Sequence, residues 1–404
     1  MATHPEIPGV IAVPGATSVQ YRRNRRGELA IWWREIDRVA LILALFLMAL
    51  GAAAVAAASP ASARRLSTAT EQLGDLHFFM LHLRWLALGL GFMIAGSMLS
   101  RDMARRAAIL FAGAMLIVLL LVPLIGTEVN GARRWINLGM TFQPSSFLQA
   151  GYPVLLAWIL TWGMRDQKLP VIAISASVML AICGLLMLQP DFGSAVLFGG
   201  VWFALVLLLG LSVWRIVLSG VAGVAGIAAA YVFYPNARAR IDAFLSGGSP
   251  YDHVDLADRT LQAGGWSGTG FWLGTRKLAL PEAHTDYIFS VIGEEFGLVT
   301  CVIVILLYFA IVARVVLRLI EEEDLFAVLA GTGLAVQFGG QAFINILVNL
   351  QLFPSKGMTL PLISYGGSST VAMCASIGLL LAITRRNPFI KRERFSLNDI
   401  GDRR

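Results

Sequence analysis

Asp286 and His284 stand two residues apart in PEAHTDYIFS (residues 281–290), directly before an apolar run, in a chain with only 14% charged residues. A carboxylate partly withdrawn from water holds its proton more tightly, and within reach of a hydroxyl group it can act as a general base. The simpler interpretation of Asp286 is a helix N-cap. His284 has no second ligand at metal spacing, so we expect it to orient its neighbours and expect no metal site.

Two further polar stretches lie upstream of Asp286. The longer is GTEVNGARRWINLGMTFQPSS (126–146), in which Arg133 and Arg134 are neighbours. The shorter is QPDFGS (189–194), where Asp191 opens an apolar run, a position typical of a helix N-cap. The longer stretch therefore places two positive charges side by side between apolar runs.

Lysines occur in two other polar stretches. LQAGGWSGTGFWLGTRKLALPEAHTD (261–286) mixes glycines with aromatic residues and contains Lys277, while NLQLFPSKGMTLPLISYGGSST (349–370) contains Lys356. Arg276 and Lys277 form a cationic pair beside flexible backbone, which is a candidate site for a lipid phosphate, and an ordinary surface pair is the alternative. Downstream of Lys356, Ser364 and Ser368 lie among glycines, a composition that also favours close helix packing.

These candidate groups must be positioned by membrane-spanning helices. The chain has 404 residues, 57% of them hydrophobic, and a mean hydropathy of +0.71. Apolar segments of roughly 18 to 25 residues, long enough to cross the bilayer as helices, recur about ten times. We therefore predict an all-α integral membrane protein with spans near residues 39–58, 78–99, 107–125, 147–163, 171–188, 193–211, 213–233, 287–312, 325–350 and 360–383.

Charge and loop length predict the organisation around these spans. Residues 1–36 form a basic tail without the pattern of a cleavable signal peptide, so we expect it, and the C-terminal tail 387–404, to be cytoplasmic. Residues 37–386 then form the membrane domain, with a long extracytoplasmic loop at 232–285. The net charge of +7 reflects this topology, and no nucleic-acid-binding fold accompanies it.

The polar stretches, in this order and spacing, resemble the SEDS family (shape, elongation, division and sporulation) of membrane peptidoglycan glycosyltransferases. The similarity extends from WWREIDR (32–38) and AASP (57–60) to LAITRR (381–386). The chain resembles the cell-division branch most, because it has a basic N-terminal extension. The elongation branch, whose type member is RodA, is the nearest alternative.

The resemblance implies a function. The family polymerises glycan strands from lipid II, a disaccharide-pentapeptide on undecaprenyl diphosphate, at the outer face of the bacterial cytoplasmic membrane, here at the division septum. It implies a class B penicillin-binding protein (FtsI-like) and other divisome proteins as partners, within membrane lipids. Asp286 falls on the family's essential acidic residue, with supporting roles for His284, Asp191, Ser364 and Ser368.

The same resemblance suggests how the donor's diphosphate is bound. Positive side chains on the outer face would stabilise it as the leaving group departs. No sugar nucleotide is required, and the sequence specifies no cofactor, although a divalent cation (Mg²⁺ or Mn²⁺) could share this task. The candidates are Arg133, Arg134, Lys277 and Lys356.

One departure from the family pattern concerns the start of the fourth span. The family has Glu and Lys three residues apart after QPS, whereas this chain has Ser146 and Gln149 in QPSSFLQ. This spacing places both side chains on one helical face. We expect a retained polar contact without an ion pair, and an inactive or partner-dependent variant is the alternative.

Two other classes of function stay open at the level of the sequence. A lipid-linked oligosaccharide transporter, such as a lipid II flippase, would place ionisable groups within several spans. Arg84, Glu294 and Glu295 are the charges that fit it. A non-catalytic divisome scaffold is supported only by Ser146 and Gln149.

Overall fold

The computed structural model describes residues 25–68, 72–129, 132–137, 141–164, 166–210, 213–246, 252–355 and 357–386. Two compact units are distinguished, Ile36–Arg385 and a smaller one of Met1–Glu35 with Arg386–Arg404. In the smaller unit, the described residues include α1 (Arg25–Glu35). Lys356 lies outside the described residues, so the structure gives it no position.

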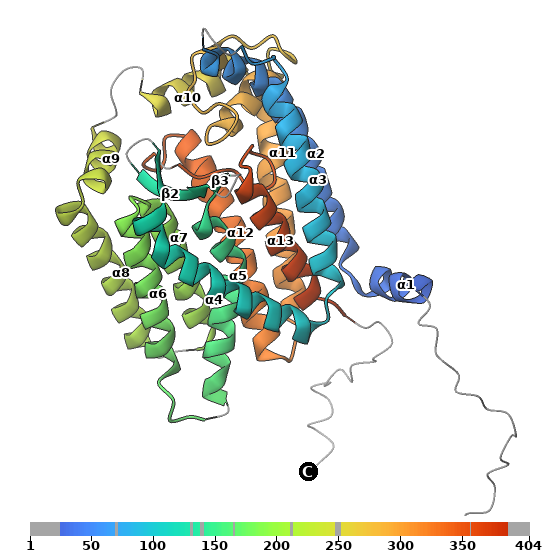
Figure 1. Ribbon diagram of the computed structural model, residues 1–404, viewed down its shortest axis with the longest axis vertical. Coiled ribbons are helices and arrows are strands. Elements are labelled where there is room, and N and C mark those ends of the chain that lie inside the picture. The colour runs from blue at the N-terminus through green and yellow to red at the C-terminus, as the bar shows by residue number, and fades with distance from the viewer. Residues whose placement is uncertain are drawn as a thin grey trace, which may run out of the picture. The chain divides into compact units, whose positions relative to one another are not determined.

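The larger unit is a bundle of apolar helices (Figure 1). Eight helices in the described part are long and apolar enough to cross a membrane, and two shorter apolar helices, α7 and α13, complete the ten expected spans. The prediction of an all-α membrane protein is therefore confirmed. The helices are α2 (Arg38–Leu66), α3 (His77–Met98), α4 (Arg101–Ile125), α5 (Pro144–Thr161), α6 (Val171–Leu188), α7 (Phe192–Leu208), α8 (Val213–Phe233), α11 (Ile288–Leu319), α12 (Leu325–Asn349) and α13 (Ser368–Ile383).

Ion pairs join helix ends at one end of the bundle. Asp37 caps α2 and pairs with Arg314 at 3.0 Å and with Arg318 at 3.0 Å. Arg101, at the start of α4, pairs with Glu322 at 2.9 Å. The start of α2, the start of α4 and the end of α11 therefore lie together, as the predicted alternation of spans requires.

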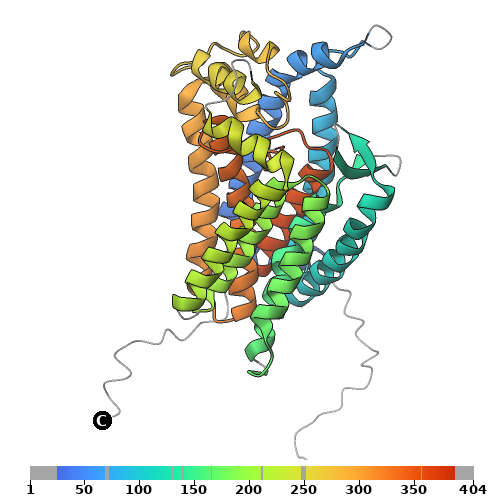
Figure 2. The same cartoon turned by 90° about the vertical axis from the view of Figure 1, so that its left-hand side faces the viewer.

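The centre of the bundle is formed by α5, α12 and α13, most of whose residues are buried. Close helix contacts depend on glycine: a Cβ on Gly378 would lie 2.6 Å from the Met93 carbonyl oxygen, and one on Gly51 would lie 2.7 Å from the Leu362 oxygen. In contrast, α8 has no buried residue and lies at the edge of the bundle (Figures 1 and 2).

Two structured segments lie between helices at the other end. Residues 127–142 form a three-stranded antiparallel sheet in the order β1 (Thr127–Val129), β2 (Ala132–Asn137), β3 (Thr141–Phe142). The long loop contains α9 (Pro235–Leu245), α10 (His253–Ala263) and a 3₁₀ turn at Arg276–Leu278. The basic stretch NARARIDAFL (236–245) lies within α9.

The glycine-rich part of the long loop packs into a kink in α11. Gly297 interrupts that helix with φ 83°, and Leu298 N donates to the Gly265 carbonyl oxygen at 2.9 Å. A Cβ on Gly268 would lie 2.3 Å from the Glu295 carbonyl oxygen, so only glycine fits this contact between two backbones. The glycines therefore serve to join the loop to the membrane domain.

Candidate active site

Asp286 lies in the turn before α11, between two of the segments that join helices. Side chains of α12 hold the backbone of this turn by hydrogen bonds. Asn345 and Asn349 each donate from Nδ2 to the Asp286 carbonyl oxygen, at 2.8 and 3.2 Å. The two asparagines are four residues apart, so they share one face of α12. Asn345 also donates to the Met358 carbonyl oxygen at 2.6 Å, which joins the turn to the 357–367 segment.

The residues just before Asp286 are held from the other side. Ser364 Oγ donates to the Thr285 carbonyl oxygen at 2.6 Å, and Tyr365 N donates to the His284 carbonyl oxygen at 2.9 Å. His284 Nδ1 lies 2.8 Å from Ser62 Oγ of α2. Burial lowers the pKa of His284 to about 4, so the neutral imidazole orients the turn, as the sequence suggested.

The carboxylate of Asp286 is not used in these contacts. The N-cap of α11 is Tyr287, and no side chain caps that helix. Within the described residues no hydrogen bond or ion pair involves the Asp286 carboxylate. The N-cap interpretation of Asp286 is therefore wrong, and its half-buried carboxylate is available for chemistry.

The surroundings raise the pKa of Asp286 from 3.8 to about 7. Burial is the largest cause, and the negative charge of Glu282 adds to it, while Arg134 and Arg240 act in the opposite direction. Removal from water penalises the charged form of a carboxyl group. A general base works best when its pKa is near the working pH. Its ionised form is then populated, and that form still binds a proton strongly enough to remove it from the substrate.

Arg134 is the predicted cation that the structure brings to Asp286. A Cβ built on Gly357 would lie 3.5 Å from Asp286 Oδ2 and 4.0 Å from Arg134 Nη1, so both groups face one small space. Arg134 Nε donates to the Gln189 carbonyl oxygen at 2.9 Å, and its Nη2 donates to the Pro190 oxygen. These acceptors are neutral, so they position the guanidinium without cancelling its charge.

The neighbouring Arg133 is placed differently. It is exposed and pairs with Glu128 at 3.3 Å. Successive residues of a strand point to opposite faces, and this explains why only one of the two arginines of β2 contacts the α6–α7 turn. The structure therefore does not bring Arg133 to Asp286.

Lys277 does not lie where a phosphate-binding role requires. Its side chain is 3% exposed, forms an ion pair with Glu295 and donates to the Ala57 carbonyl oxygen at 2.9 Å. Glu294 accepts from the backbone nitrogens of Arg276 and Lys277 at 2.6 and 2.9 Å. A buried ammonium group needs a carboxylate and carbonyl partners. Lys277 finds its carboxylate on α11, and these charges therefore hold the long loop against that helix. Lys277 is therefore not part of the anion site.

The remaining predicted positions have structural contacts. Asp191 is the N-cap of α7, as predicted, and accepts from Ser194 N at 3.2 Å and Ser194 Oγ at 2.8 Å. Ser368 begins α13 and is half-buried. Among the described residues, no group of three or more His, Cys, Asp or Glu side chains could hold a metal ion.

The altered pair at the start of α5 is buried, but its two members do not bond to each other. Ser146 Oγ donates to Gln143 Oε1 at 3.0 Å, one turn back along the chain. Gln149 is 5% exposed and makes no hydrogen bond within the part of the chain that the structure describes. The expected contact is therefore absent there, because the short serine side chain bonds within the first turn.

The sequence did not reveal two features of the site. Arg240 of α9 acts on Asp286, although NARARIDAFL has two arginines and nothing indicates which faces inward. The role of Asn345 and Asn349 was also missed. Their four-residue spacing, continued back to Gln341, was a readable signal of one polar helix face.

A helix bundle with a half-buried carboxylate and, at the same end, an arginine bonded to neutral carbonyl oxygens defines a class of multi-pass membrane protein with a polar site at the membrane edge. The chain belongs to the FtsW/RodA/SpoVE family of cell cycle proteins, whose family profile matches residues 37–388. This confirms the resemblance stated from the sequence motifs.

Individual relatives agree with this assignment. The chain is 36% identical over 373 residues to a probable peptidoglycan glycosyltransferase FtsW of Caulobacter vibrioides, covering 91% of this chain and 94% of the relative. It is 35% identical to the corresponding protein of Methylococcus capsulatus, covering 91% and 95%.

Solved structures show the same fold. A chain from a peptidoglycan synthase complex that coordinates polymerization and crosslinking has a TM-score of 0.71 and 31% identity, covering 86% of this chain and 97% of that one. The rod shape determining protein RodA of Thermus thermophilus has a TM-score of 0.63 and 27% identity, covering 86% and 96%.

Proposed function

We infer that this chain is a peptidoglycan glycosyltransferase that polymerises lipid II into glycan strands during cell division. Membership of the family and the FtsW relatives support the reaction class and the division role. The observation that carries the proposal is the carboxyl group of Asp286. The backbone of this residue is hydrogen-bonded to α12. Its carboxyl group has a pKa of about 7 and faces the same space as Arg134.

The reaction uses these two groups in different ways. The acceptor hydroxyl oxygen forms a bond to the anomeric carbon of the donor, and its proton passes to the Asp286 carboxylate. The bond from the anomeric carbon to the diphosphate oxygen breaks, and the lipid diphosphate leaves with the electron pair. Arg134 stabilises the negative charge that grows on this leaving group.

The site lies at the outer face of the cytoplasmic membrane in this proposal, with both termini in the cytoplasm. The opposite end of the bundle carries Arg101, Arg314, Arg318 and Arg385, and basic residues are retained on the cytoplasmic side. The FtsW relatives support a location at the division septum.

A class B penicillin-binding protein is the proposed partner. Support comes from the similar chain of a synthase complex that coordinates polymerization and crosslinking. A polymerase at the outer face would deliver glycan strands directly to an enzyme that joins their peptides.

The charges that favoured a transporter have other roles in the structure. Glu294 and Glu295 accept hydrogen bonds from the long loop and pair with Lys277. Arg84 lies on the exposed surface of α3. These three residues therefore do not form a polar path through the bundle.

The test is a polymerisation assay with purified protein and labelled lipid II, alone and with the penicillin-binding partner. Glycan ladders that disappear in Asp286→Asn are expected. Movement of lipid II between leaflets without polymer would indicate a transporter, and neither activity, with or without the partner, would indicate a scaffold.

A further inference from the structure

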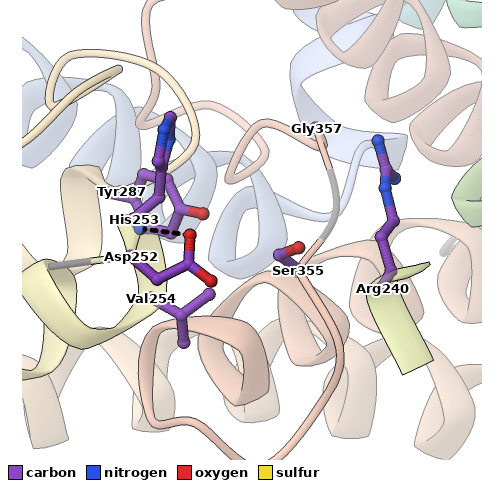
Figure 3. A pocket seen from close by; sticks show the side chains of 7 residues that line it. All are labelled: Arg240, Asp252, His253, Val254, Tyr287, Ser355 and Gly357. Carbon is purple, nitrogen blue, oxygen red and sulfur yellow. Dashed lines mark hydrogen bonds between the residues drawn. The ribbon is translucent and has the colours of Figure 1, made fainter. Parts of the chain in front are cut away.

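A cavity of about 280 Å³ opens beside Asp286, between the long loop and the segment before α13. Arg240 forms one side, and Asp252, His253 and Tyr287 form the other, with Ser355 between them (Figure 3). The cavity reaches the reaction centre, because Tyr287 follows Asp286 in the chain and a Cβ added to Gly357, which also lines it, would lie 3.5 Å from Asp286 Oδ2.

The side chains around this cavity suit a sugar. His253 and Tyr287 have ring centroids 6.4 Å apart and offer an aromatic edge for the apolar face of a sugar ring. Arg240 offers several N–H donors for hydroxyl and acetamido oxygens. Asp252, whose Oδ1 accepts from His253 N, and Ser355 add acceptors for sugar hydroxyls.

Arg240 is free to bind a ligand. Among the described residues it has neither an ion pair nor a hydrogen bond, and its guanidinium extends along the cavity (Figure 3). Arg238, two residues earlier on α9, instead pairs with Asp242 at 3.5 Å and lies 5.7 Å from the centroid of the Tyr231 ring, an exposed arrangement away from the cavity. The two arginines of one short helix therefore have different surroundings.

Size and position decide which part of the substrate fits. The volume is at the lower limit of small-molecule sites and fits one sugar ring, not a disaccharide-pentapeptide. Arg134, on the separate β2 strand, serves the donor's leaving group in the proposed function. A base must lie beside the hydroxyl that it deprotonates, so the sugar next to Asp286 is the one that carries the attacking hydroxyl.

We propose that this cavity is the acceptor subsite, which binds the terminal N-acetylhexosamine of the acceptor and directs its hydroxyl to Asp286. Arg240 is a substrate-binding residue in this proposal, which rests on the proposed glycosyltransferase function. Donor and acceptor are then held by different elements of the chain, the donor diphosphate by β2 and the acceptor sugar by α9 and α10.

The test is a single-transfer assay with two lipid II analogues. A donor-only analogue has its attacking hydroxyl blocked, and an acceptor-only analogue has a non-cleavable anomeric linkage, so one transfer gives one tetrasaccharide. KM is measured for each analogue with the other saturating. The variants are Arg240→Ala, Arg240→Lys and the matched control Arg238→Ala, and thermal unfolding checks that each is folded.

Arg240→Ala is expected to raise the acceptor KM about tenfold, because hydrogen bonds from a charged donor are lost, with the donor KM within twofold. Arg240→Lys should lie between wild type and alanine, and Arg238→Ala should match wild type. An equal rise in the donor KM, an unchanged acceptor KM, or the same effect in Arg238→Ala would overturn the acceptor subsite. If the wild type transfers no sugar, with or without the penicillin-binding partner, the proposed function itself fails.

Discussion

Replacement of Asp286 by asparagine separates catalysis from stability, because the structure predicts opposite effects on the two. Asparagine keeps the size of the side chain and leaves the backbone bonds from Asn345 and Asn349 in place. It cannot accept a proton. Polymerisation should therefore fall by about 10²-fold or more.

The stability change follows from the raised pKa. In the folded chain the carboxyl group has a pKa of about 7, against 3.8 for an ordinary Asp. The folded state therefore binds more protons than the unfolded state between these pH values, so stability falls as pH rises through this window. When the group is fully ionised, it lowers the free energy of unfolding by at most about 4 kcal/mol. The actual loss is smaller, because the half-buried side chain is partly screened by solvent.

Asp286→Asn should therefore unfold at a higher temperature than wild type at pH 8, and this difference should shrink below pH 4. Functional residues commonly reduce stability in this way. The assay pairs ladder formation with thermal unfolding at both pH values. Near-normal ladders, or a variant less stable than wild type at pH 8, would refute the assignment of a desolvated base.

Other residues give further tests. Gly357→Ala adds a methyl group between Asp286 and Arg134 at ordinary contact distance. It should reduce polymerisation at least severalfold without lowering the melting temperature. The control Gly91→Ala, which has open space around it, should change neither the polymerisation rate nor the melting temperature. Ser146→Glu with Gln149→Lys should be tolerated better than either single change, because each alone buries an unpaired charge; equal melting temperatures for singles and double would show that the sites do not interact. Lys277→Ala should lower the melting temperature by several degrees, since it leaves Glu295 buried without its partner; an unchanged melting temperature with weaker donor binding would return Lys277 to the anion site.

Much of the fold could be predicted because apolar length alone identifies membrane-spanning helices. All ten expected spans correspond to helices, including α7 and α13, which are shorter than a typical span. The interpretation of Asp191 as an N-cap also held, because a cap depends on neighbours in the chain. Local patterns are sufficient for such features.

The site was harder to predict where it depends on contacts between distant segments. Lys277 and Arg134 look alike in sequence, as cations in polar stretches. Only the fold shows that Lys277 is paired with Glu295, 18 residues further along, while Arg134 bonds to neutral carbonyls 55 and 56 residues away. The inward position of Arg240 likewise depends on how α9 packs, which its own sequence does not determine.

The most direct test of Asp286 as the base is the pH dependence of kcat/KM, measured as the initial rate of polymerisation at lipid II concentrations well below KM. The carboxylate must be ionised to accept the proton, and its pKa is about 7. The rate should therefore rise from pH 5.5, reach half its maximum near pH 7 and level off above pH 8. A rate that stays constant from pH 5.5 to 8.5, or that falls as pH rises through 7, would contradict the role of Asp286.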